Sequence, residues 1–148
     1  MLLALAAFAG GGPEQAAAGG LELRLEIQDA GGRGAQRFAA GETVDFVLEI
    51  RNAGETALAL EFATARTHDF AVLDAEGREA WRWSRGRLFA QALASIELAA
   101  GETRRFAASW DQRDASGAPV RPGRYQVLGT LASVPSPPPA GPLALEIE

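Results

Sequence analysis

The sequence predicts an all-β domain that folds as an antiparallel β-sandwich of about seven to nine strands. Three observations predict this class. From Leu21 to Ile147, short runs of apolar residues alternate with polar ones at a period of two, as in strands with one buried face. Glycine, proline, asparagine and aspartate recur about every ten residues between these runs, as turn residues do. No segment carries a 3.6-residue period long enough for a crossover helix, which excludes α/β folds.

The first half of this domain contains three expected strands, at residues 21–28, 44–51 and 58–62. Turn residues separate them at 31–34, 41 and 52–55. Alternation places one set of side chains on the buried face: Leu21, Leu23, Leu25, Ile27, Val44, Phe46, Leu48, Ile50, Leu58, Leu60 and Phe62.

The second half continues the pattern around a turn at Glu76-Gly77. The inward positions are Phe70, Val72, Trp81, Trp83, Phe106, Ala108, Trp110, Tyr125, Val127, Gly129, Leu131, Leu143, Leu145 and Ile147. Only residues 87–95 lack clear alternation, and they could hold a short helical turn. The chain has no disulfide to join two sheets, so the three tryptophans and Tyr125 are expected to fill the centre of an immunoglobulin-like sandwich.

Composition limits the function classes. A chain of 148 residues is long enough for one domain with a real core. The net charge of −5 disfavours a nucleic-acid partner, because no basic excess exists to displace phosphate counterions. The absence of cysteine excludes thiolate catalysis and thiolate metal sites within this chain. All 14 basic residues are arginine, which leaves no lysine nucleophile.

Residues 1–20 are expected to lie outside the fold, which leaves residues 21–148 as the sandwich domain. The first nine residues are apolar and too few to span a bilayer, and small residues follow, ending with Ala16-Ala17-Ala18. This pattern is typical of a secretory signal cleaved after Ala18, although a positively charged start is missing. It predicts a periplasmic or secreted protein without an integral membrane span. A disordered tail on a cytoplasmic protein is the alternative.

The residues predict neither a catalytic centre nor a metal or cofactor site. His68 is the only histidine, and its neighbour Asp69 should face the opposite side of a strand, so the two cannot form a catalytic pair. We expect His68 to be a partly exposed residue at a strand edge and Asp69 to brace a nearby loop through backbone N–H groups. Asp111 and Asp114 supply only two carboxylates, fewer than a calcium site needs, so they indicate a turn.

Arginines surround the tryptophan-rich segment at positions 78, 82, 85 and 87. One interpretation is a solvated face on which guanidinium groups stack on exposed aromatic rings. The other is a recognition patch on Ser84-Arg85-Gly86-Arg87, since arginine and aromatic residues are enriched at interface hot spots. An arginine on an exposed loop would suit a trypsin-like pocket.

Six motifs follow one another along the chain: RN at 51–52, HDF at 68–70, WRWS at 81–84, FAQ at 89–91, WDQRD at 110–114 and PGRY at 122–125. Taken in this order, residues 21–133 resemble the BsuPI-type intracellular proteinase inhibitor domain. The resemblance implies an immunoglobulin-like sandwich whose end loops enter a protease active site without covalent chemistry. The WDQRD–GRY pair alone also occurs in other bacterial sandwich modules, including flagellar hook-cap-like domains.

The resemblance implies a protease partner, with the serine type expected. The chain is expected to be non-enzymatic and monomeric. The candidate protease contacts are Ser84, Arg85, Arg87, Asp111 and Arg113. A non-catalytic envelope or secreted module that binds protein or glycan is the alternative, because one fold can carry many unrelated sites.

Overall fold

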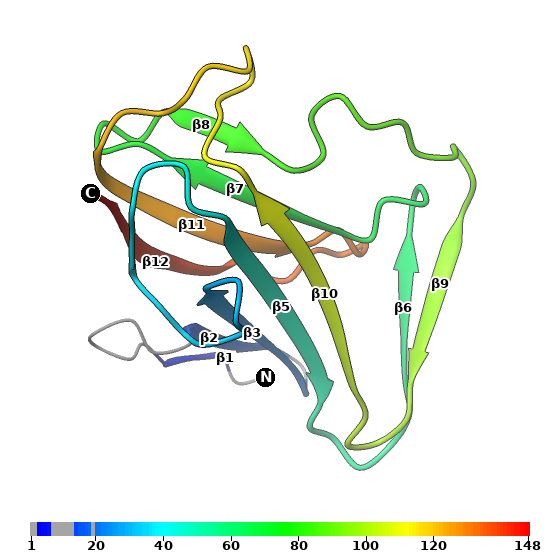
Figure 1. Cartoon of the computed structure of the whole chain (residues 1–148). Coiled ribbons are helices and arrows are strands. Elements are labelled where there is room, and N and C mark those ends of the chain that lie inside the picture. The colour runs from blue at the N-terminus through cyan, green and yellow to red at the C-terminus, as the bar shows by residue number, and fades with distance from the viewer. Residues whose placement is uncertain (1–2, 7–13, 19) are drawn as a thin grey trace.

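The computed structural model describes residues 3–6, 14–18 and 20–148, and it confirms an all-β sandwich (Figure 1). Within these ranges there is no helix, and hence none long and apolar enough to cross a membrane. The strands are β1 (Leu3–Ala6), β2 (Glu14–Ala18), β3 (Leu21–Gln28), β4 (Arg37–Phe38), β5 (Val44–Asn52), β6 (Leu58–Phe62), β7 (His68–Leu73), β8 (Glu79–Arg82), β9 (Ala94–Leu98), β10 (Thr103–Trp110), β11 (Gly123–Leu131) and β12 (Ala140–Ile147).

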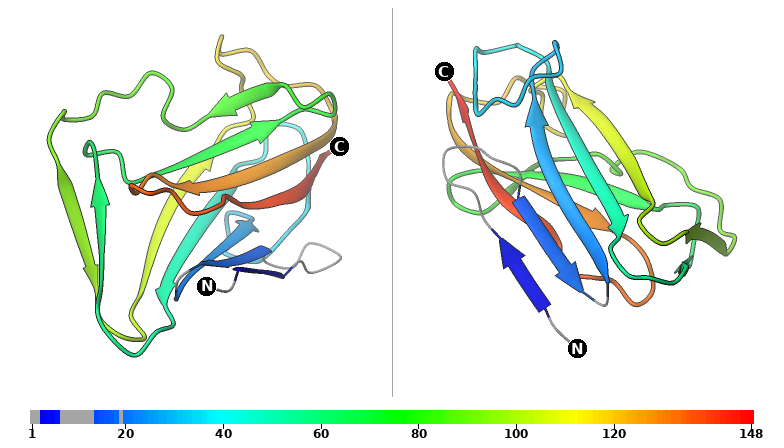
Figure 2. Two further views of the ribbon diagram at one scale, coloured as in Figure 1. Left: turned by 180° about the vertical axis from the view of Figure 1, so that it is seen from behind. Right: turned by 90° about the horizontal axis from the view of Figure 1, so that it is seen from below.

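Two five-stranded sheets form the layers of the sandwich, as the views in Figure 2 show. One sheet has the order β1-β2-β3-β5-β10 and the other the order β4-β12-β11-β7-β8. A separate pair, β6 and β9, lies beside them. All pairs are antiparallel except β12 with β4, which is parallel over two residues and differs from the purely antiparallel expectation.

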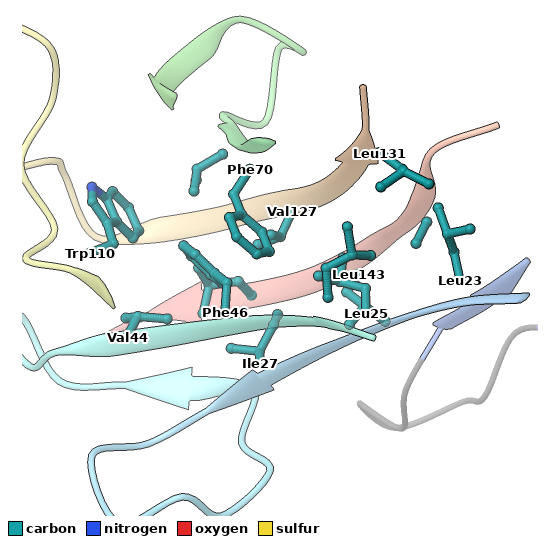
Figure 3. Close-up of a cluster of buried hydrophobic side chains, with 14 of the residues drawn as sticks. Leu23, Leu25, Ile27, Val44, Phe46, Phe70, Trp110, Val127, Leu131 and Leu143 are labelled. Atoms are coloured by element: carbon teal, nitrogen blue, oxygen red, sulfur yellow. The ribbon is translucent and has the colours of Figure 1, made fainter. Parts of the chain in front are cut away.

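Most of the side chains expected to face inward are buried in the core (Figure 3). Five of them are partly buried and pack against it: Leu58, Trp81, Trp83, Phe106 and Ala108. Leu25, Phe46 and Val127 are fully buried between the layers. The sheets approach closely at Gly129, where a Cβ atom would lie 3.1 Å from Leu25 Cδ1 and 3.2 Å from Leu48 Cδ1. An alanine there would therefore require the ends of these two leucine side chains to shift.

Aromatic rings fill the end of the sandwich where β10 and β11 meet their connection. Phe46 lies 5.9 Å from Phe70, 5.9 Å from Trp81 and 6.3 Å from Trp110, measured between ring centroids. The Tyr125 hydroxyl donates to the Arg121 carbonyl at 2.5 Å, the tyrosine-corner contact typical of immunoglobulin-like sandwiches.

The fold class is confirmed, and three details differ from the sequence expectations. From Leu21 onward the chain has ten strands, where about seven to nine were expected, partly because the run Ala94–Leu98 forms β9 where residues 87–95 gave no clear pattern. Residues 87–93 form an irregular connection and not a helical turn. Trp83 does not fill the centre of the sandwich, because β8 ends at Arg82 and the ring lies at the base of the following connection.

Two stretches of the N-terminal segment pair with β3 or with each other, and a domain boundary after residue 20 stays a prediction. Residues 14–18 pair antiparallel with β3, and residues 3–6 pair with residues 15–18. β3 would otherwise have an unpaired edge, and its free N–H and C=O groups favour the addition of another strand. Residues 1–2, 7–13 and 19 of the predicted signal segment lie outside the described residues, and cleavage after Ala18 stays a prediction.

Candidate functional site

Among the described residues, the polar group with the most hydrogen-bond and ion-pair partners lies at the base of the β8–β9 connection (residues 83–93). Asp69 on β7 is fully buried, and its carboxylate accepts hydrogen bonds from Ser84 N at 3.0 Å and from Ser84 Oγ at 2.6 Å. It also pairs with Arg82 Nη1 at 3.1 Å and with Arg66 Nη2 at 3.3 Å. A buried carboxylate needs such partners to offset its loss of hydration. Asp69 thus braces the connection, as the sequence indicated, and two of its partners, Arg82 and Ser84, lie 13 and 15 residues further along the chain.

The arginines around Asp69 form a chain of ion pairs across β8. Arg82 Nε donates to Glu79 Oε2 at 3.0 Å, and Arg85 pairs with Glu79 Oε1. Burial opposes the charge on Arg82, but hydrogen bonds to Glu79 and Asp69 outweigh it and raise the pKa of Arg82. Ion pairs with Asp69 on β7 and with Glu79 on β8 therefore hold the start of the connection.

An aromatic stack also packs against the base of the same connection. It is formed by Phe106, His68, Trp83 and Phe89. The His68 ring lies between Phe106 and Trp83, with both centroids 4.5 Å away, and Phe89 lies 5.8 Å from Trp83. Burial lowers the pKa of His68, a shift that the nearby charge of Asp69 only partly opposes. His68 is partly exposed, as the sequence predicted, and begins β7. The sequence did not predict that Trp83 and Phe106 cover the faces of its ring.

The structure places the three candidates of the first loop, Ser84, Arg85 and Arg87, directly on this base. Ser84 is bound to Asp69, and the half-exposed Arg85 reaches Glu79. Arg87 donates from Nε to the Trp83 carbonyl at 2.9 Å, and its guanidinium lies 4.5 Å above the Trp83 ring. The stacking of arginine on an aromatic ring that the sequence suggested therefore occurs at Arg87.

Sequence reasoning missed the apolar residues of this connection. The side chain of Leu88 is 100% exposed and that of Leu93 is 87% exposed. Among the described residues only one other large apolar side chain, Val134, is comparably exposed. The signal available in the sequence was the loss of alternation across residues 87–93, which indicates that these leucines have no sheet face to cover.

The second candidate loop, the β10–β11 connection (residues 111–122), is a closed turn. Asp114 Oδ1 accepts from Ser116 N, Ser116 Oγ and Ala118 N at 2.9, 2.6 and 3.1 Å, and these bonds, that of Ser116 Oγ foremost, lower the pKa of Asp114. Asp111 accepts from Arg113 N at 3.1 Å, and Arg113 Nη1 donates to the Gly117 carbonyl at 2.8 Å.

Gln112 fixes this turn to the rest of the sandwich. It is buried, has a φ of 63°, and donates from Nε2 to the carbonyls of Ala39 and Glu42 at 2.9 and 2.8 Å. Its Oε1 accepts from Gly41 N at 3.0 Å. The side-chain oxygens and nitrogens of this segment are thus directed mainly at its own backbone and at the neighbouring turn.

The two loops extend in different directions (Figures 1 and 2). Arg78, which the sequence grouped with the first loop, instead lines a surface groove of about 990 Å³ with Arg121 and Arg124. In the part of the chain that the structure describes, no three acidic or histidine side chains gather as metal ligands.

The sequence matches the BsuPI family, described as intracellular proteinase inhibitor, over residues 33–136, which is more than half of the chain. No curated protein matches it significantly.

Among solved structures, the C-terminal domain of Wzt is similar with a TM-score of 0.53 and 16% identity, over 92% of this chain and 78% of that one. A β-glucosidase from Listeria innocua has a TM-score of 0.46 and 14% identity over 86% of this chain, which spans only 16% of the enzyme. A CARDB domain from Pyrococcus furiosus, in complex with di-metal ions, has a TM-score of 0.44 and 11% identity, over 88% of this chain and 90% of that one. The likeness to Wzt shows a shared fold.

Proposed function

The chain belongs to the BsuPI family of intracellular proteinase inhibitors, and we propose that it inhibits a serine protease noncovalently by presenting a loop of its β-sandwich. One observation supports this mode of action most directly. The β8–β9 connection exposes apolar side chains at its tip, while buried Asp69 and the aromatic stack hold its base. Binding loops that are rigid before they meet a partner lose less entropy on association.

Within this proposal the first loop makes the main contact. Ser84 lies at its base, and Arg85 and Arg87 lie beside the exposed tip, where their charges can meet the rim of a protease cleft. Asp111 and Arg113 are a second contact in the same proposal. Their carboxylate and guanidinium are largely exposed, with exposed side-chain fractions of 70% and 55%.

We propose no catalytic role for this chain. His68 is its only histidine, its ring faces are covered by Trp83 and Phe106, and its Nδ1 lies 3.0 Å from Thr67 Oγ1. A noncovalent inhibitor needs no nucleophile. The family description favours the cytoplasmic location, whereas the expectation of export rests on residues 1–18 alone. We further propose a monomer that binds one protease molecule.

The proposal is tested by titrating the purified protein against a panel of serine, cysteine and metalloproteases with peptide substrates. We expect tight, reversible inhibition of a serine protease and a 1:1 complex on size-exclusion chromatography with light scattering. Failure to inhibit any protease of the panel would contradict the function and favour a protein- or glycan-binding module.

A variant pair then locates the contact. Changing Arg85 and Arg87 to glutamine should weaken inhibition at least about tenfold, which is about 1.4 kcal/mol. The matched control changes Arg24 and Arg33 to glutamine, since both are exposed and lie on other parts of the surface. Unchanged inhibition by the first variant, with a loss when Asp111 and Arg113 become asparagine and glutamine, would move the contact to the β10–β11 connection.

A further inference from the structure

Leu88 is the most unusual residue of the β8–β9 connection because the fold gives it no contact that would shield it from water. Its side chain is 100% exposed, although leucine is among the residue types most often buried. The hydrogen bonds of Asp69 at the base of the connection show that the segment is anchored and not a displaced part of the core. A fully exposed leucine on a braced segment is typical of a side chain that is buried by a partner.

The residues on both sides of Leu88 are attached to one indole ring. Arg87 bonds to the Trp83 carbonyl and lies over the Trp83 ring, and the Phe89 ring packs 5.8 Å from that ring. Ala65 N also donates to the Ala90 carbonyl at 3.0 Å. These anchors fix the chain before and after Leu88 and direct its side chain away from the sandwich.

The backbone at the tip is available for pairing. Within the described residues, the N–H and C=O groups of Leu88 and Phe89 have no hydrogen-bond partner, and neither residue belongs to a strand. An extended segment with free backbone groups can add to an exposed strand of another protein, while its side chains enter pockets there. Serine proteases bind peptides in this way and read one side chain in a primary specificity pocket.

The neighbouring arginine is a poorer candidate for that pocket. Insertion of Arg87 would cost its bond to the Trp83 carbonyl and its position over the indole, whereas Leu88 gives up nothing. We propose, on the basis of the proposed inhibitory function, that Leu88 fills an apolar primary pocket of the target protease. The target then cleaves after large apolar residues and not after arginine or lysine, and Arg87 is a positioning residue.

The test uses chymotrypsin, whose primary pocket is an apolar slot, trypsin, whose pocket holds an aspartate, and the serine protease most strongly inhibited in the panel. Inhibition constants are measured for the wild-type chain, Leu88→Ala and Leu88→Arg. The matched control is Leu93→Ala, which removes a similarly exposed leucine from the other end of the same connection.

We expect the wild-type chain to inhibit the apolar-specific proteases in preference to trypsin. Leu88→Ala should weaken this inhibition at least about thirtyfold, which corresponds to the roughly 2 kcal/mol of a hot spot. Leu88→Arg should shift the preference towards trypsin, and Leu93→Ala should change inhibition less than about threefold. All variants should keep the wild-type melting temperature because the altered side chains are exposed.

Three outcomes would overturn the inference while leaving the inhibitory function intact. These are inhibition that is insensitive to both Leu88 variants, a wild-type preference for trypsin, and a strongly inhibited protease that cleaves its peptide substrates after charged residues. Rapid cleavage next to Leu88 without inhibition, detected by mass spectrometry, would show that the tip is a substrate. Absence of inhibition across the whole panel would remove the proposed function itself.

Discussion

The β8–β9 and β10–β11 connections both follow tryptophan-bearing strands, yet they are stabilised in opposite ways. In the β10–β11 connection, Asp111 and Asp114 accept hydrogen bonds from backbone groups of the turn itself, and Gln112 bonds the backbone of residues 39–42. In the β8–β9 connection, the strong contacts gather at the base around Asp69, and the tip at Leu88 has no hydrogen bond within the described residues. One loop is closed by its own polar groups and the other is open at its tip.

The comparison shows which feature distinguishes a structural turn from a recognition loop when both are polar in sequence. Both segments contain arginine, serine and glycine, so composition does not distinguish them. The distinction lies in which backbone groups already have partners, because an unpaired group on a fixed base can still bond to another molecule. Substitutions at Asp69, Gln112 and His68 test how each connection is held.

The largest effect is expected at Asp69. Asp69→Asn removes the charge that holds Arg66, Arg82 and Ser84, and it should lower the free energy of unfolding by about 3 kcal/mol. This is the low end of the range for a broken buried pair, because the two arginine side chains are 38% and 36% exposed. Urea denaturation measures the change.

The control for this prediction is Asp114→Asn, at a carboxylate that also accepts several hydrogen bonds but lies within a surface turn. It should destabilise the protein much less than Asp69→Asn. A loss at Asp69 below about 1 kcal/mol, as for a surface ion pair, would mean that the base of the β8–β9 connection is not held by this carboxylate.

Gln112 should give the next largest effect. Gln112→Ala removes the three bonds that tie the β10–β11 connection to residues 39–42, and it should cost about 2 kcal/mol because buried partners lose their bonds. Gln112→Gly should be about 1 kcal/mol less damaging than alanine, since glycine adopts the positive φ without strain. Equal losses in the two variants, measured by urea denaturation, would argue against backbone strain at this position.

The smallest effect is the pH response of the aromatic stack. Because burial lowers the pKa of His68 below its usual 6.5, the unfolded chain binds this proton first as the pH falls. The contribution of neutral His68 to the free energy of unfolding is therefore fully present above about pH 6.5, and it is lost as the pH falls through the pKa of His68 in the folded protein. His68→Phe has no such proton, so its melting temperature should fall less than that of the wild type between pH 7.5 and 5.5.

The β10–β11 connection provides the contrast for this measurement. Hydrogen bonds lower the pKa of Asp114 below its usual 3.8, so its contribution is present above that value and is lost only in stronger acid. Parallel pH dependence of the wild type and the His68→Phe variant between pH 7.5 and 5.5 would contradict a role for His68 in this window.

The sequence could predict the sandwich because its alternation is strong in the central strands, where Phe46, Leu48 and Val127 face the core. It could not predict β1 and β2, since β1 lies within an apolar run without polar residues and β2 consists largely of alanine, so neither shows an alternation of apolar and polar residues. Ala94–Leu98 was missed because it directly follows a segment without alternation. The parallel pairing of β4 covers too few residues to leave any signal.

For the site, the sequence identified the right segment but not the roles within it. The bracing role of Asp69 was predictable because a carboxylate between apolar residues needs partners. Its partners Arg82 and Ser84 were not predictable, because the pairing of β7 with β8 brings them to Asp69 from 13 and 15 residues further along the chain. The charge of Arg87 marked it as a candidate contact in the sequence. The exposure of Leu88 could not be predicted, because it depends on how the flanking residues pack on Trp83.

Phe46 and the rings around it join the two sheets by packing, where antibody-like domains use a disulfide. Since the chain contains no cysteine, its folded state does not depend on the thiol–disulfide poise of the surroundings. The free energy of unfolding should be the same in a glutathione-reduced solution as in an oxidising one. The domain therefore needs no disulfide-forming machinery to mature, and reductants used to protect a protease in an assay leave it intact.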